Sequence, residues 1–73
     1  MHNFYFTFGS AEHFPFQNGY LIVVADSLFT AIKIFRNKYP DYSENTLNCA
    51  FYYDENEWKK ITNYMGKCHE IIM

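Results

Sequence analysis

The clearest pattern of apolar and polar positions lies between Asp26 and Tyr39. Apolar residues recur there at spacings of three and four, which places them on one stripe of an α-helix: Leu28, Ala31, Ile32, Phe35 and Tyr39. Asp26 or Ser27 can accept hydrogen bonds from the first turn, and Pro40 cannot continue the helix. The pattern therefore predicts a helix over residues 26–39, with an apolar stripe that covers a sheet.

Four other segments carry strand patterns. Residues 3–8 alternate with period two, so that the phenylalanines at positions 4, 6 and 8 share one face. Residues 20–25 are apolar on both faces, which predicts a central strand. Residues 68–73 predict a short last strand. Residues 47–53 predict a third strand that places four side chains on one face: Leu47, Cys49, Phe51 and Tyr53.

A second helix is predicted to begin after Asp54. Asp54 can cap the first turn and Glu57 can reach back to it, the pattern of a capping box. Gly66 is a natural stop for this helix. The apolar stripe of the helix would comprise Trp58, Ile61, Tyr64 and Met65.

The order of elements is β-β-α-β-α-β over residues 1–73, without a linker or a repeat, which predicts a single α+β domain. Each helix joins two strands, so we expect both helices on one face of a four-stranded sheet, as a two-layer sandwich. Alternate strand residues such as Tyr5 and Thr7 would then lie on the uncovered face.

Aromatic residues make up 22% of the 73 residues, namely eight Phe, seven Tyr and one Trp. A domain of this size has too small an interior to bury all of them, and apolar residues left outside usually mark a contact site. The candidate partner-binding residues are Phe14 and Phe16 in the loop over residues 11–19, Tyr5 on the sheet and Phe29 on the flank of the first helix. Alternatively, Phe14 and Phe16 fold back and close one end of the core.

The formal net charge of −2 argues against a nucleic-acid binder, which normally has a basic face. A four-stranded sheet with exposed aromatic rings can nevertheless stack bases, so a single-stranded nucleic-acid binder is the alternative function. The longest apolar run, residues 20–25, is far too short to span a membrane. The start of the chain has no basic leader pattern. We therefore expect a cytoplasmic protein.

Four side chains could ligate a metal: His13, Cys49, Cys68 and His69. Structural zinc takes four such ligands and stabilises small domains, so a zinc-stabilised domain that forms a homodimer is a further alternative. The sequence has no Cys-x-x-Cys pair, however, and successive strand residues 68 and 69 point to opposite faces. Both cysteines would otherwise be small buried apolar groups. No third group is placed to orient a Cys–His pair, so we expect no enzyme activity.

Several short motifs carry a resemblance. They are residues 5–10 (YFTFGS), Gly19-Tyr20, Ala25-Asp26 before a helix, and residues 50–54 (AFYYD) before another. Their order resembles a loose family of small proteins encoded by phages and integrative elements of Gram-positive bacteria. Some small proteins from this genetic setting are anti-CRISPR inhibitors that bind an RNA-guided nuclease. The resemblance implies a non-enzymatic module that binds a bacterial protein in the host cytoplasm, and it supplies no catalytic residues.

Overall fold

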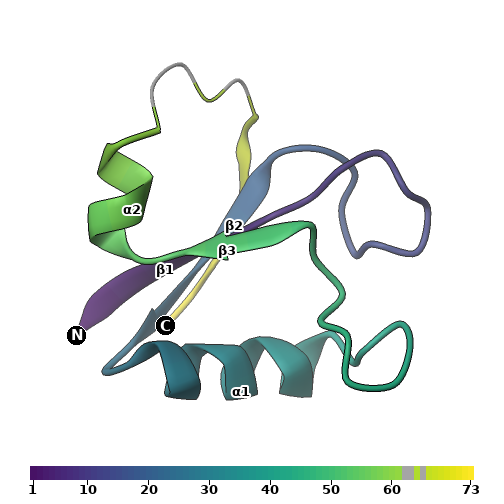
Figure 1. Ribbon diagram of the computed structural model, residues 1–73, viewed down its shortest axis with the longest axis horizontal. Helices are drawn as coiled ribbons and strands as arrows, with labels where there is room; N and C mark the ends of the chain where they lie inside the picture. The colour runs from purple at the N-terminus through teal and green to yellow at the C-terminus, as the bar shows by residue number, and fades with distance from the viewer. Residues whose placement is uncertain (62–63, 65) are drawn as a thin grey trace.

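A computed structural model describes residues 1–61, 64 and 66–73 of the chain. Its elements follow the predicted order (Figure 1). They are β1 (His2–Thr7), β2 (Tyr20–Ala25), α1 (Leu28–Lys38), β3 (Phe51–Tyr53), α2 (Glu55–Lys59) and β4 (Cys68–Ile72). The α+β class and the four-stranded sheet are therefore confirmed.

Helix α1 begins and ends where its local sequence directs. The hydroxyl of Ser27 accepts a hydrogen bond from the backbone N–H of Thr30 at 3.1 Å, which caps the first turn. At the other end, Tyr39 has extended backbone angles ahead of Pro40, and its N–H donates to the carbonyl of Phe35 at 2.8 Å. The predicted helix is thus confirmed, with each end shifted by one or two residues.

The strand order in the sheet is β3-β1-β2-β4. Strand β1 pairs antiparallel with β2 and with β3, whereas β4 pairs parallel with β2. The apolar strand β2 is therefore central, as predicted, and the short strands β3 and β4 form the two edges. Because β1 lies antiparallel to its neighbours, β2, β3 and β4 all run in the same direction.

This topology separates the two helices, which differs from the expectation that both lie on one face. The connection through α1 leads from β2 to the β3 edge, and the connection through α2 returns from β3 to the β4 edge. Crossovers between parallel strands are right-handed, so two crossovers in opposite directions lie on opposite faces. The contacts agree, because Phe6 stacks on Phe35 of α1 and the next strand residue, Tyr5, stacks on Trp58 of α2. Figure 1 shows α1 and α2 on the two sides of the sheet.

The core lies between the sheet and α1. Phe6 and Phe35 are fully buried at its centre, with ring centroids 4.5 Å apart and ring planes 4° apart. The alternation predicted for β1 is confirmed, since its phenylalanines all face this core. The buried apolar residues are Phe4, Phe6, Phe8, Leu21, Val23, Ala25, Ala31 and Phe35.

The third strand is shorter than predicted, because only residues 51–53 pair with β1. Residues 47–50 form an irregular approach to the strand, in which the N–H of Ala50 donates to the carbonyl of Thr7 at 2.7 Å. This irregularity changes the face of the following residues. Leu47 and Cys49 pack against the core, whereas Phe51 and Tyr53 pair with residues on the opposite face. The four residues therefore do not share a face.

Helix α2 is also shorter than predicted. Its start is confirmed, since Asp54 and Glu57 form the full capping box. The helix ends at Lys59, however, and Ile61 lies beyond it. Tyr64 turns back to the sheet, where its hydroxyl donates to the carbonyl of Gly19 at 2.8 Å. Met65, predicted to extend the apolar stripe, lies outside the described residues.

Candidate functional site

Tyr5, predicted as a contact residue on an open sheet face, packs inside a second aromatic cluster. Its ring stacks on that of Trp58, with centroids 4.4 Å apart and planes 3° apart. Tyr20 and Tyr64 close around the same tryptophan, at centroid distances of 4.8 and 5.0 Å. The ring of Tyr5 is therefore engaged by the chain itself. The sheet face that would stack bases is occupied at this position.

Phe14 and Phe16 also face inward, as the alternative interpretation of the loop proposed. Both rings pack against Phe8, at centroid distances of 6.0 and 5.8 Å. The ring of His69 also stacks on Phe16, with ring centroids 4.7 Å apart and ring planes 3° apart. Both phenylalanines are half-buried. They close one end of the core and leave little of their rings for a partner.

Four of the sixteen aromatic side chains are exposed, and only one of the four predicted contact residues is among them. The exposed fractions are 73% for Phe29, 58% for Tyr42, 64% for Phe51 and 44% for Tyr52. The other twelve are buried or half-buried. The sequence therefore predicted that some aromatic rings stay exposed, but three of the four residues predicted to be exposed, Tyr5, Phe14 and Phe16, are half-buried. Tyr52 was missed because its exposure depends on β3 being an edge strand.

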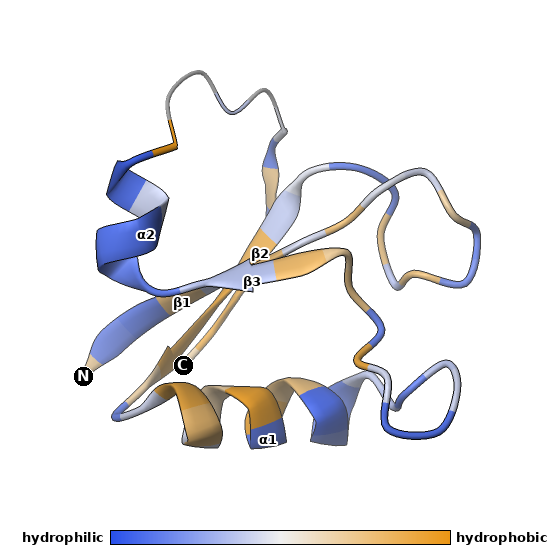
Figure 2. Cartoon of the chain, in the orientation of Figure 1, coloured by the Kyte–Doolittle hydropathy of each residue, from blue (hydrophilic) through white to orange (hydrophobic). Residues whose placement is uncertain are grey.

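Phe29 and Tyr52 flank a surface that we term the α1–β3 surface, made of Phe29, Ile32, Arg36, Leu47, Cys49 and Tyr52. Most of it forms a groove of about 460 Å³, lined by Ile32 and Arg36, by residues 45–47, 49 and 50, and by Tyr52. Phe29 lies one turn from Ile32 on the helix, and it lines a second hollow with Thr30, Lys33, Ile34 and Asn37. Figure 2 shows hydrophobic residues on the first turns of α1.

Charges at this surface are largely compensated within the chain. The Nε of Arg36 donates to the carboxylate of Asp41 at 2.7 Å, so the groove has a neutralised cation at its rim. Lys33 lies beyond it, with its ammonium 5.7 Å from the ring centroid of Phe29. The surface thus combines apolar side chains with the polar side chains of Asn45 and Thr46, and it has an ion pair at its edge.

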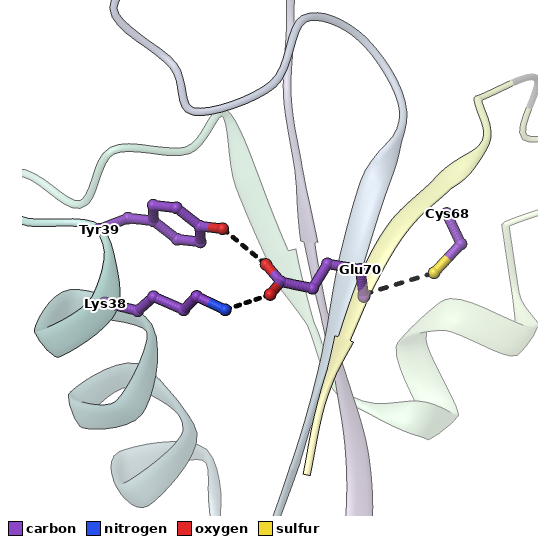
Figure 3. A network of polar contacts seen from close by, with 4 residues as sticks. All are labelled: Lys38, Tyr39, Cys68 and Glu70. Atoms are coloured by element: carbon purple, nitrogen blue, oxygen red, sulfur yellow. Dashed lines mark hydrogen bonds and ion pairs between the residues drawn. The ribbon is translucent and has the colours of Figure 1, made fainter.

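Further along α1, a carboxylate fixes the helix to strand β4 (Figure 3). Glu70 of β4 forms an ion pair with Lys38 and accepts a hydrogen bond from the hydroxyl of Tyr39 at 2.6 Å. The hydrogen bond from Lys38, followed by that from Tyr39, lowers the pKa of Glu70. Burial, with the bond to Glu70, raises the pKa of Tyr39 to about 12. This network holds the sheet edge opposite to β3 and takes no part in the groove.

The four predicted metal ligands are engaged separately. His69 donates its Nε2–H to the carbonyl of Asn18 at 2.6 Å, so this nitrogen has no lone pair for a metal. His13 Nδ1 lies 2.9 Å from the side-chain oxygen of Asn48. The thiol of Cys68 donates a hydrogen bond to the carbonyl of Glu70 at 3.5 Å. Within residues 1–61, 64 and 66–73, no three His, Cys, Asp or Glu side chains gather where they could hold a metal ion. The structure therefore does not assemble the predicted ligand set.

Cys49, the remaining predicted ligand, lies in the wall of the groove. Burial raises the pKa of its thiol to about 12, so that it stays protonated near neutral pH. A protonated thiol is a poor nucleophile and a poor metal ligand. Cys49 thus contributes an apolar side chain to the groove, as the alternative interpretation of the cysteines proposed.

The chain matches no known protein-family model, and comparison with the curated proteins and with the solved structures gives no significant match. The resemblance to phage-encoded proteins therefore stays a hypothesis. In the part of the chain that the structure describes, neither helix has the length and apolarity that a bilayer crossing requires.

Proposed function

We propose that this chain is a non-enzymatic protein-binding module that uses the α1–β3 surface for contact. The observation that carries the proposal is the exposure of Tyr52 in the wall of the groove and of Phe29 on the adjacent face of α1, in a chain that buries twelve of its sixteen aromatic residues fully or partly. Exposed aromatic residues next to a groove are typical anchors of protein interfaces. A base-stacking role is less well supported, because Trp58 occupies the sheet face at Tyr5.

The narrower proposal concerns the target. On the basis of the resemblance described above, we propose a phage or mobile-element protein that inhibits a host RNA-guided nuclease by binding to it. The formal net charge of −2 is compatible with a contact made mainly through apolar residues.

The general proposal is tested by capture from a bacterial extract with the tagged chain as bait, followed by mass spectrometry. We expect a protein that the wild-type chain retains and that the double variant Phe29→Ala/Tyr52→Ala loses. Ile71→Ala is the matched control, because Ile71 is similarly exposed but lies on β4, at the opposite edge of the sheet. If the folded wild-type chain retains no protein, the proposal fails.

The target is tested separately in cells. A bacterial strain that carries an active CRISPR system and a matching spacer is challenged with phage, with and without expression of the chain. We expect expression to restore plaque formation, and the double variant to abolish this effect. Unchanged plaque numbers together with a different captured protein would contradict the target while leaving the binding module intact.

A further inference from the structure

The outer edge of β3 presents backbone groups to a partner. In the described sheet, β3 is an edge strand whose one neighbour is β1. The hydroxyl of Thr7 donates to the carbonyl of Phe51 at 3.2 Å, so this carbonyl faces β1. Backbone groups of successive residues in an antiparallel strand face opposite sides. The N–H and C=O of Tyr52 therefore face away from the sheet, at the centre of the edge.

The groove lies beside the same residue. The side chain of Tyr52 is on the α1 side of the sheet, since Tyr52 pairs with Phe6, and it forms one wall of the groove. Ile32 of α1, Leu47 and Cys49 supply further apolar lining, beside the polar side chains of Asn45 and Thr46. Its cation, Arg36, is already paired with Asp41. An uncharged apolar group is thus the occupant whose burial leaves no unpaired charge.

We propose that the β3 edge binds an extended segment of a partner protein, which adds a fifth strand beside Tyr52 and places a large apolar side chain in the groove. Backbone hydrogen bonds to Tyr52 would supply affinity, and the groove would supply specificity for one side chain. Because side chains alternate along a strand, the partner residues before and after the one in the groove would face the other side of the sheet, where Phe51 lies. The inference rests on the proposed function and specifies how the partner is held.

The short length of β3 is one usual protection against such pairing, but the edge lacks the protection that side chains give. Exposed edge strands are commonly blocked by lysine, proline or inward-pointing charges. Strand β3 contains three uncharged aromatic residues, Phe51, Tyr52 and Tyr53, which are all strong strand formers. The short length of β3 limits the number of backbone bonds, so the groove must provide the remaining affinity.

The test uses a phage-displayed library of random peptides of about ten residues as the probe, since such a length spans an edge strand. We expect selected peptides with an apolar residue at one fixed position and β-formers at alternate positions. Their dissociation constants are then measured by fluorescence anisotropy against two variants. Tyr52→Ala removes the side chain and keeps the N–H, whereas Tyr52→Pro removes both. We expect the selected peptides to bind Tyr52→Pro about tenfold more weakly than Tyr52→Ala, because the proline variant lacks one hydrogen-bond donor at the edge.

Proline is tolerated where an edge N–H faces solvent, and circular dichroism verifies the fold of each variant. If Tyr52→Pro does not fold, N-methyl-Tyr52, assembled by chemical ligation at Cys49, replaces it and is compared with the wild-type chain. The inference is overturned if the peptides bind Tyr52→Pro and Tyr52→Ala, or the N-methylated and wild-type chains, with equal affinity. A selection that enriches no peptide also overturns it. Self-association of the chain that N-methylation abolishes also overturns it, because the occupant would then be a second copy. A captured protein that binds the N-methylated chain unchanged would leave the proposed function standing and refute only this mode of binding.

Discussion

The rings of Tyr5 and Trp58 lie face to face, 4.4 Å apart and within 3° of parallel, and they join α2 to the sheet. Helix α2 has no fully buried residue, and Trp58 supplies its aromatic contacts to the sheet, with Tyr5 and with Tyr20. The stack also explains why the second sheet face is not the open aromatic surface that the strand pattern predicted. The same pair yields the first prediction.

Replacing Trp58 with alanine should lower the free energy of unfolding by about 2–3 kcal/mol, because a large half-buried ring and its stacking partner lose their contact. Trp58→Phe keeps a ring over Tyr5 and should cost about 1 kcal/mol or less. Urea unfolding followed by far-ultraviolet circular dichroism measures both values. Equal stability of the alanine variant and the wild-type chain would show that α2 is held by other contacts.

The contact between Glu70 and Lys38 should make stability depend on pH in the acid range. Since the pKa of Glu70 is lowered in the folded chain, its stabilising effect is full above the unfolded pKa of about 4.3. The effect is lost as the pH falls through the lower folded pKa. Thermal unfolding between pH 7 and pH 2 should therefore show a smaller acid-induced decrease for Glu70→Gln than for the wild-type chain. Parallel pH profiles of the two proteins would contradict the assignment.

Gly19 should not tolerate a side chain. Its φ angle of +78° is in the left-handed region, and an added Cβ would lie 2.4 Å from the carbonyl oxygen of Lys67. We expect Gly19→Ala to cost about 2 kcal/mol or more, as the sum of backbone strain and a backbone clash. Gly9→Ala is the control, since its Cβ would meet Phe14 at an ordinary 3.6 Å. Equal loss of stability in both variants would mean that the junction of β2 and β4 is more adaptable than its geometry indicates.

The thiol of Cys49 should react slowly with iodoacetamide in the folded protein. With a pKa of about 12, the thiolate fraction at pH 8 is about one in ten thousand, against roughly a quarter for an unperturbed thiol of pKa 8.5. Peptide mapping by mass spectrometry distinguishes this cysteine from Cys68, and unfolding in urea should restore an ordinary rate. Fast native alkylation of Cys49 would show that the groove admits water to the sulfur.

Local features of the chain were predictable from sequence because they depend on neighbouring residues. Ser27 and Pro40 define the ends of α1, and Asp54 and Glu57 form the predicted capping box. The alternation over residues 3–8 correctly placed Phe4, Phe6 and Phe8 in the core. Each of these outcomes follows from contacts within about four positions along the chain or from the twofold period of a strand.

The arrangement of the surface was decided by tertiary structure. The placement of β3 and β4 at opposite edges sent α2 to the second face, where Trp58 covers Tyr5. Folding of the first loop enclosed Phe14 and Phe16, and the irregular backbone before Phe51 separated it from Leu47 and Cys49. The sequence determined how many aromatic rings this small chain must accommodate. Which rings stay outside depends on long-range strand pairing, and a local pattern of apolar and polar residues does not encode that pairing.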